Sequence, residues 1–161
     1  MCRILDIGGG DHPCGDIVID LVSPSKTSGV DYVVGDACYL PFRSNVFLRV
    51  VSHGALNYFF DDGMFFKEVA RIMKRDGILL LSALSYYSFF VNFLDVLGRN
   101  PSGAFKLAFN TIRRRYRWYS VGNLMKKLTY SGFKVIKAYQ NVSFFWRPTS
   151  KPHNILVVAT L

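Results

Sequence analysis

Three short apolar segments near the start of the chain each end in glycine or in an acidic residue. A glycine lets the backbone turn sharply and approach a ligand with no Cβ in the way. A carboxylate at a strand end can accept two hydrogen bonds from a ribose diol. The segments are residues 3–7, 17–21 and 32–34, and the residues at their ends are Asp6, Gly8, Gly9, Gly10, Asp20, Gly35, Asp36 and Ala37. Because ligands of parallel sheets bind where the strands end, this pattern predicts a nucleoside site.

The spacing of these residues distinguishes between two nucleotide classes. The dinucleotide pattern GxGxxG needs a third Gly or Ala where Pro13 stands, and an acid about 20 residues further on. Asp20 follows Gly8 by only twelve residues, and six residues separate Gly10 from Ile17. Six residues are too few for the helix whose N-terminus would hold a pyrophosphate. The spacing therefore favours a ligand with a ribose and no phosphate, and best of all a cationic sulfonium.

The elements that position these residues alternate between strand and helix. Strands are predicted at residues 46–52 and 78–82, the latter buried on both faces. A helix capped by Asp61 and Asp62 is expected to end with Lys74 and Arg75 before Gly77, and a second helix runs from Ser120 to Gly132. Two strands, residues 133–139 and 155–159, follow one another at the end. The prediction is an α/β fold with a mainly parallel sheet, a closing antiparallel hairpin, and a first crossover helix that is reduced or missing.

Several of these segments together resemble the class I, Rossmann-like methyltransferases that use S-adenosylmethionine, in a short form similar to methyltransferase type 11. Residues 5–10 are similar to the first motif of that family, and Asp20 to its ribose-binding acid. Residues 35–37 and 40–42 resemble its adenine-contacting segment, and residues 70–77 a variant of its R-x-L-K-P-G-G motif. The resemblance implies S-adenosylmethionine as cofactor. The residues expected to bind it are Asp6, Gly8, Gly10, Asp20, Asp36, Ala37 and Ser52.

No residue stands out as a nucleophile, and methyl transfer needs none. The reaction is an in-line displacement whose catalysis comes largely from the proximity and orientation of the reactants. His53 and Tyr58 follow the fourth strand and are the candidates to orient an acceptor or to take its proton. A structural hydrogen-bonding role for His53 is the alternative. Asn57-Tyr58 stands where many relatives have Glu-His, so a non-catalytic S-adenosylmethionine-binding protein remains a second interpretation.

The chain is basic, and the excess of positive charge lies in its last third. Of 20 Lys and Arg residues against 11 Asp and Glu, residues 101–161 hold eleven basic residues and no acidic one. Arg113, Arg114, Arg115 and Arg117 alternate with aromatic residues as in RNA-binding surfaces, although a solvated helix end has the same composition. The alternative function is therefore an RNA or other macromolecule methyltransferase.

Residues 85–119 are expected to form a helical insertion that caps the acceptor site within a single domain of residues 1–161. Its first half is rich in Tyr and Phe, which favours a lid over a small-molecule or lipid-like acceptor. Residues 77–94 carry no charge, but their Ser and Tyr content and change of period predict a strand followed by a helix and no transmembrane segment. Peripheral contact with a bilayer through Tyr87, Phe89, Phe90, Phe93 and Leu94 stays open.

Cysteine content and the first residues give an expectation for the compartment. Cys2, Cys14 and Cys38 make an odd count with no CxxC pair, so neither a disulfide framework nor a metal site is expected. The first residues lack the apolar stretch of a secretory signal. The expected location is the cytoplasm.

Overall fold

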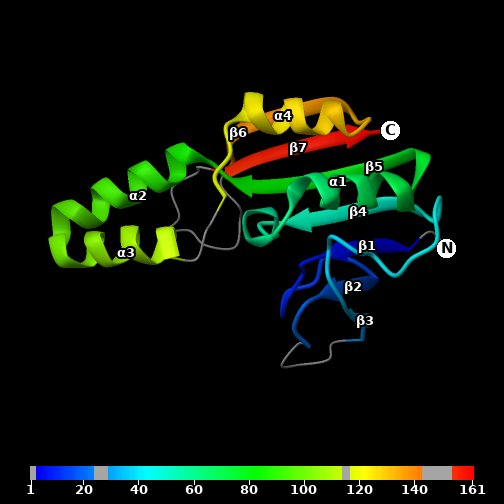
Figure 1. Cartoon of the computed structure of the whole chain (residues 1–161), viewed down its shortest axis with the longest axis horizontal. Helices are drawn as coiled ribbons and strands as arrows, with labels where there is room; N and C mark the ends of the chain where they lie inside the picture. Colours follow the sequence, from blue (N-terminus) through cyan, green and yellow to red (C-terminus); the bar gives the residue numbers. More distant parts are fainter. Residues whose placement is uncertain (1–2, 24–28, 114–116, 143–153) are drawn as a thin grey trace.

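The computed structural model describes residues 3–23, 29–113, 117–142 and 154–161, and its centre is a seven-stranded sheet (Figure 1). The strand order is β3-β2-β1-β4-β5-β7-β6. Strands β1 to β5 pair in parallel, and β7 pairs antiparallel with both β5 and β6. The strands are β1 (Ile4–Ile7), β2 (Ile17–Asp20), β3 (Asp31–Val34), β4 (Phe47–His53), β5 (Met73–Leu84), β6 (Lys134–Val142) and β7 (Asn154–Thr160). The predicted α/β class with a mainly parallel sheet and a closing antiparallel hairpin is confirmed.

Four α-helices and one short 3-10 helix connect the described strands. They are η1 (Leu56–Tyr58), α1 (Asp62–Ile72), α2 (Tyr86–Arg99), α3 (Pro101–Arg113) and α4 (Val121–Tyr130). The Asp61 side chain caps α1 by accepting a hydrogen bond from the Met64 amide, and the Ser120 side chain caps α4 in the same way through Asn123. Both caps agree with the helix starts predicted from the sequence. No helix in the described ranges is long and apolar enough to cross a membrane.

The end of α1 differs from the prediction. The helix ends at Ile72, and Lys74 and Arg75 lie in β5 instead of the last helical turn. Met73 pairs with Phe47 of β4, so the chain enters the sheet directly from the helix. A basic pair before a glycine is a common helix end, but here the tertiary pairing of Met73 overrides that local signal.

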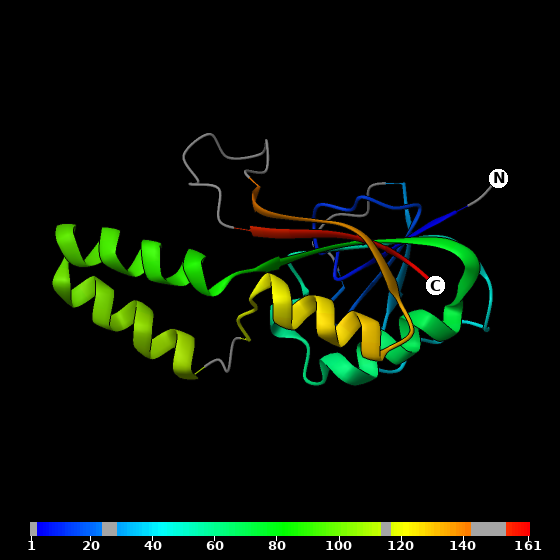
Figure 2. The same cartoon turned by 90° about the horizontal axis from the view of Figure 1, so that it is seen from above.

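Helices α1 and α4 lie on the same face of the sheet (Figure 2). Leu79 and Leu81 of β5 point to that face and are fully buried, whereas Ile78 and Leu80 on the opposite face are each 40% exposed. The prediction that β5 is buried on both faces was therefore wrong. The physical reason is that β1 and β2 are joined by residues 8–16 without a helix, and no described helix packs over Ile78 and Leu80. The missing first crossover helix was correctly predicted.

Helices α2 and α3 form a hairpin that extends beyond the end of the sheet to which β4 and β5 point (Figure 1). The change from strand to helix inside residues 77–94 is confirmed, because β5 ends at Leu84 and α2 begins at Tyr86. At the base of the hairpin, Tyr86 donates its amide to the Tyr119 carbonyl at 3.1 Å, and Tyr119 donates to Leu84 at 3.3 Å. The two ends of the insertion therefore meet beside the sheet.

A buried carboxylate ties α1 to α4 and to the chain that returns from the hairpin. Asp62 accepts hydrogen bonds from the Tyr119 hydroxyl and the Lys127 ammonium, both at 3.0 Å, and Arg117 lies 3.1 Å away. Burial alone raises the pKa of Asp62, but the hydrogen bonds from Lys127 and Tyr119 outweigh it and hold this pKa below its ordinary value. The carboxylate is thus charged in the folded protein and stabilises it.

We expect Asp62→Asn to lower the free energy of unfolding by about 1–3 kcal/mol, because it leaves buried donors without a charged acceptor. The lowered pKa means that the stabilisation by Asp62 is present above the unfolded-state pKa of about 3.9 and is lost as the pH falls through the folded-state pKa. The loss in the variant, measured by urea unfolding, should therefore shrink in acid. Asp31→Asn, which removes an exposed pair with Arg3, is the control and should have little effect. Equal stability of wild type and Asp62→Asn at pH 7 would contradict the expectation.

Candidate functional site

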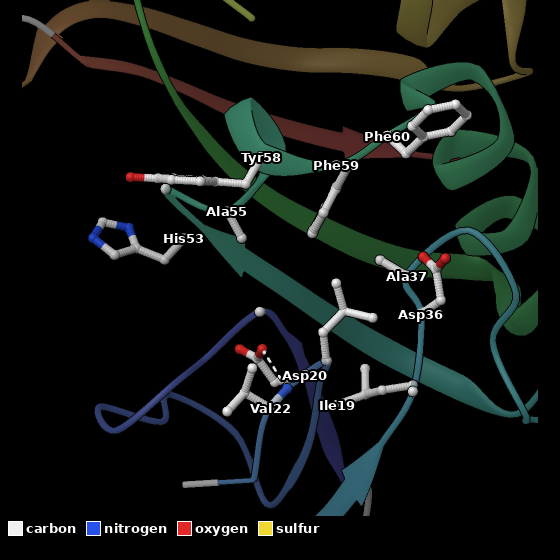
Figure 3. Close-up of a pocket in the computed structure, with 14 residues that line it drawn as sticks. Ile19, Asp20, Val22, Asp36, Ala37, His53, Ala55, Tyr58, Phe59 and Phe60 are labelled. Carbon is white, nitrogen blue, oxygen red and sulfur yellow. Dashed lines mark hydrogen bonds between the residues drawn. The ribbon is translucent and has the colours of Figure 1, made fainter. Parts of the chain in front are cut away.

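A pocket of about 420 Å³ opens where β1, β2, β3 and β4 end (Figure 3). This volume lies within the roughly 300–1,000 Å³ typical of small-molecule sites. It brings together four residues predicted to bind the cofactor and the two residues predicted to act in catalysis. The lining residues predicted from the sequence are Gly8, Asp20, Asp36, Ala37, His53 and Tyr58. Asp6, Gly10 and Ser52 are not among the described lining residues.

Two glycines shape the turn after β1. Gly8 has a φ of +79°, and a Cβ at this position would lie 2.3 Å from the Cβ of Ala55, so both backbone conformation and space require glycine. The Gly8 amide donates to the Ile19 carbonyl at 2.8 Å, which ties the turn to β2. Gly10 also has a positive φ, of +51°. The turn therefore passes directly beside the end of β2.

Asp20 stands at the end of β2 and faces the pocket (Figure 3). Its carboxylate accepts hydrogen bonds from the Gly10 amide at 3.1 Å and from the Val22 amide at 3.4 Å. These backbone donors hold the side chain in place and leave lone pairs for a ligand, since a carboxylate can accept about four hydrogen bonds. The side chain is therefore held in one orientation at the pocket wall.

Asp6 lies beneath the glycine turn and is almost completely buried. Its Oδ2 accepts the Cys14 amide at 2.7 Å, whereas Oδ1 is the one buried side-chain oxygen without a hydrogen-bond partner in the described part of the chain. A Cβ on Gly9 would come within 2.5 Å of Oδ2, so the turn packs directly on the carboxylate. Burial raises the pKa of Asp6, and the hydrogen bond from Cys14 lowers it in part. An unsatisfied carboxylate oxygen beneath the turn favours a cationic group nearby.

The segment that contains Asp36 and Ala37 is held by α1. Asp36 accepts the Cys38 amide at 2.8 Å, so the turn role considered from the sequence is present, and both residues also line the pocket. Further along, Arg71 donates to the carbonyls of Leu40 at 2.9 Å and Phe42 at 2.7 Å. Arg71 belongs to the motif of residues 70–77. Through these two hydrogen bonds it holds the segment after β3, which begins with the pocket residues Asp36 and Ala37.

His53 ends β4 at the opposite side of the pocket from Asp36 (Figure 3). Its Nδ1 lies 2.8 Å from the Ser82 hydroxyl, which also accepts the Gly54 amide at 2.9 Å. Burial lowers the pKa of His53, and the charge of Asp6 opposes this effect in part. A lowered pKa keeps the imidazole neutral near pH 7, the form that can accept a proton. The contact with Ser82 therefore fixes the orientation of the ring on the pocket wall.

Ser52 and Asn57 lie apart from the pocket. The Ser52 hydroxyl is fully buried and donates to the Ile7 carbonyl at 3.0 Å, so it positions the end of β1. The Asn57 side chain accepts the Leu84 amide at 2.9 Å and donates to the Leu84 and Arg117 carbonyls. Ser52 as a direct cofactor ligand stays a prediction. Asn57 instead joins the pocket loop to the base of the α2–α3 hairpin.

The sequence analysis missed an apolar part of the pocket wall. Side chains after β2 and after β4 complete this wall. The aromatic pair Phe59-Phe60 after η1 was a signal in the sequence that could have revealed part of it. The lining residues that were missed are Ile19, Leu21, Val22, Gly54, Ala55, Phe59 and Phe60, whereas Gly35 had been noted at the end of the third predicted strand. Tyr58 and Phe60 are 63% and 83% exposed, so they form an aromatic rim at the pocket mouth.

The electrostatic character of the pocket excludes some ligands. Two carboxylates, Asp20 and Asp36, stand on its wall, and the described lining contains no Lys or Arg. Asp6 lies close by, beneath the glycine turn. In a partly buried site, such an arrangement attracts a cationic ligand and repels a phosphate. Within the described residues, no group of three or more His, Cys, Asp or Glu side chains is placed to hold a metal ion.

Comparison with known proteins agrees with this geometry. Residues 18–81 match a protein family described as methyltransferase domain. Over these residues the chain is similar to a methyltransferase domain. This confirms the resemblance noted from the sequence, together with S-adenosylmethionine as the cofactor of the family. A comparison with curated protein sequences gives no match.

Solved structures of similar fold include methyltransferases from several organisms. A methyltransferase from Methanosarcina mazei has a TM-score of 0.70 at 17% identity, with 99% of this chain and 92% of that chain covered. A putative methyltransferase from Haloferax volcanii, solved in complex with the Trm112 methyltransferase activator, has a TM-score of 0.69 at 16% identity, with 98% and 81% covered. Phosphoethanolamine N-methyltransferase 2 from Haemonchus contortus, in complex with S-adenosyl-L-methionine, has a TM-score of 0.66 at 15% identity, with 99% and 48% covered.

We expect Asp20→Ala to weaken binding of S-adenosylmethionine by about 1–3 kcal/mol, because it removes the carboxylate predicted to accept hydrogen bonds from the ribose. Titration calorimetry measures the change, and circular dichroism checks that the methyltransferase remains folded. Asp76→Ala is the matched control and should bind as the wild type does. Asp76 is exposed near the start of β5, at the end of the strand far from the pocket. An unchanged affinity in Asp20→Ala would remove this residue from the site.

Proposed function

We propose that this methyltransferase transfers a methyl group to a small-molecule or lipid-like acceptor that enters at the aromatic rim. The observation that carries the proposal is the exposure of Tyr58 and Phe60 at the mouth of a pocket whose inner end holds Asp20 and the glycine turn. Exposed apolar side chains gathered at the mouth of a pocket are typical of a ligand-binding surface. An acceptor with an apolar part would cover them.

The inner residues of the pocket suit S-adenosylmethionine. Asp20 would accept hydrogen bonds from its ribose, Gly8 and Gly10 would let the backbone approach it, and Asp36 and Ala37 would contact its adenine. When bound, this cofactor supplies a methyl group on a cationic sulfonium. The carboxylates of the site favour that positive charge, which supports the choice of this cofactor over a dinucleotide with its phosphates.

His53 and Tyr58 are proposed to act on the acceptor. They lie on the same side of the pocket (Figure 3), with the neutral His53 ring held by Ser82. His53 would accept the proton that an acceptor hydroxyl or ammonium releases, and Tyr58 would orient the acceptor by contact with its ring. The apolar wall and rim would exclude water from the reacting atoms.

The alternative acceptor, RNA, finds less support in the described residues. Arg117, one of the four arginines expected to hold RNA, forms an ion pair with buried Asp62 and donates to the Phe60 carbonyl. It therefore has a structural role. Arg114 and Arg115 lie outside the described residues, and of Arg113 only the backbone, at the end of α3, is described.

Two measurements test the cofactor and the class of acceptor separately. Calorimetry with S-adenosylmethionine, its demethylated product and NAD should give binding of the two sulfur ligands and none of NAD. Incubation with methyl-labelled S-adenosylmethionine and separate pools of lipid extract, small polar metabolites and RNA should then place the label in the lipid or small-molecule pool. Label in RNA alone would overturn the proposed acceptor class, and cofactor binding without any label transfer would favour a non-catalytic role.

The pH dependence tests His53. Its lowered pKa predicts a methyl-transfer rate that is constant above about pH 7 and falls as the pH drops through the folded-state pKa, because protonated His53 cannot accept a proton. His53→Gln should lower the rate at pH 7 by about 100-fold or more and remove this acid limb, while S-adenosylmethionine binds as before. His12→Gln, an exposed histidine outside the pocket lining, is the control. A His53→Gln enzyme with the wild-type rate and pH profile would exclude the base role.

A further inference from the structure

The α2–α3 hairpin presents apolar side chains to solvent on two helices. Phe90 and Leu94 of α2 are 56% and 48% exposed, and Phe105 and Phe109 of α3 are 69% and 65% exposed. The members of each pair are four residues apart, so each pair forms a stripe along its helix. Large side chains exposed to this extent on adjacent helices indicate a surface that contacts another body.

Both stripes lie away from the contact between the two helices. A Cβ on Gly103 of α3 would lie 3.5 Å from Val96 of α2, so these two residues mark that contact. At about 100° per residue, the members of each stripe lie roughly 120° and 160° around their helix from the contact residue, so each stripe faces away from the neighbouring helix. We call these four residues, Phe90, Leu94, Phe105 and Phe109, the hairpin stripe.

The charge around the hairpin stripe identifies its partner. The charged residues of α2 and α3 whose side chains the structure describes, Arg99 and Lys106, are both basic and exposed. Apolar side chains flanked by basic ones are typical of helices that lie in the headgroup region of an anionic bilayer. RNA would pair with the charges, but it offers no apolar phase for Leu94.

The dimensions of the hairpin agree with a position on the membrane surface. A helix of 14 residues such as α2 is about 21 Å long, shorter than the hydrocarbon core of roughly 30 Å. The helix can therefore lie along a bilayer but cannot cross it. The hairpin extends from the sheet edge at which the pocket opens (Figures 1 and 2).

The base of the hairpin is joined to the pocket. Asn57 binds Leu84, which precedes α2, and Arg117, which follows α3 in the chain, and it is the chain neighbour of Tyr58 on the pocket rim. A hairpin held at a surface would therefore hold the pocket mouth near that surface. We propose that the hairpin stripe and its basic neighbours dock this protein on an anionic lipid bilayer.

Vesicle flotation tests this proposal on the full chain without any acceptor. Vesicles of phosphatidylglycerol and phosphatidylcholine should bind the wild type, with weaker binding as salt is raised, and vesicles of phosphatidylcholine alone should bind it at least tenfold more weakly. The double variant Phe105→Ser/Phe109→Ser should bind the anionic vesicles at least tenfold more weakly than the wild type. Tyr130→Ser, an exposed aromatic at the end of α4, is the matched control and should bind as the wild type does.

Two measurements separate this proposal from misfolding and from the proposed function. Circular dichroism and calorimetry with S-adenosylmethionine should be unchanged in the double variant, so loss of vesicle binding with intact cofactor binding supports docking. The proposal is overturned if the wild type does not bind anionic vesicles at low salt, or if the double variant binds them equally well. It is also overturned if the double variant loses RNA binding instead, or if light scattering shows that the stripe joins two copies of the chain.

Discussion

The parallel pairing of β1 with β2 and with β4 is the constraint on which the site depends. It aligns Ile7 with Ile19 and Asp6 with Val51, so the ends of the three strands meet at one edge. The link of residues 8–16 then has to return to β2 without a helix, and it does so by packing directly on the Asp6 carboxylate. The glycine turn, the acid of β2 and the histidine of β4 become neighbours for this single reason.

The pocket built at this edge selects ligands by charge as well as by shape. Two carboxylates line it, a third lies beneath the glycine turn, and no described lining residue carries a permanent positive charge. Removal of water strengthens each of these interactions, so the preference for a cation over a phosphate is larger than in solution. The basic excess of the chain therefore belongs to another surface, and net charge alone does not describe the ligand.

The contacts around Asn57 and Asp62 join the part of the domain that carries the pocket to the base of the hairpin. Asn57 holds both ends of the insertion, and Asp62 holds Arg117, Tyr119 and Lys127. These contacts place Tyr58, at the proposed entrance for the acceptor, beside the base of the hairpin.

Local signals were enough to predict the class of the fold and much of the cofactor edge. The caps at Asp61 and Ser120, the glycine run and the position of Asp20 depend on residues close together in the chain, and backbone geometry limits what such patterns can form. The short link after β1 could also be predicted, because six residues cannot form a crossover helix.

Other features depended on contacts between distant residues, and only the tertiary structure decided them. Met73 leaves α1 for the sheet because Phe47 pairs with it, and Leu80 is partly exposed because no described helix covers its face. From the sequence, Arg117 was expected to contact RNA. In the structure it forms an ion pair with Asp62, 55 positions away in the chain. An amino-acid type states which interactions a side chain can make, whereas the partner it meets is set by the packing of the whole chain.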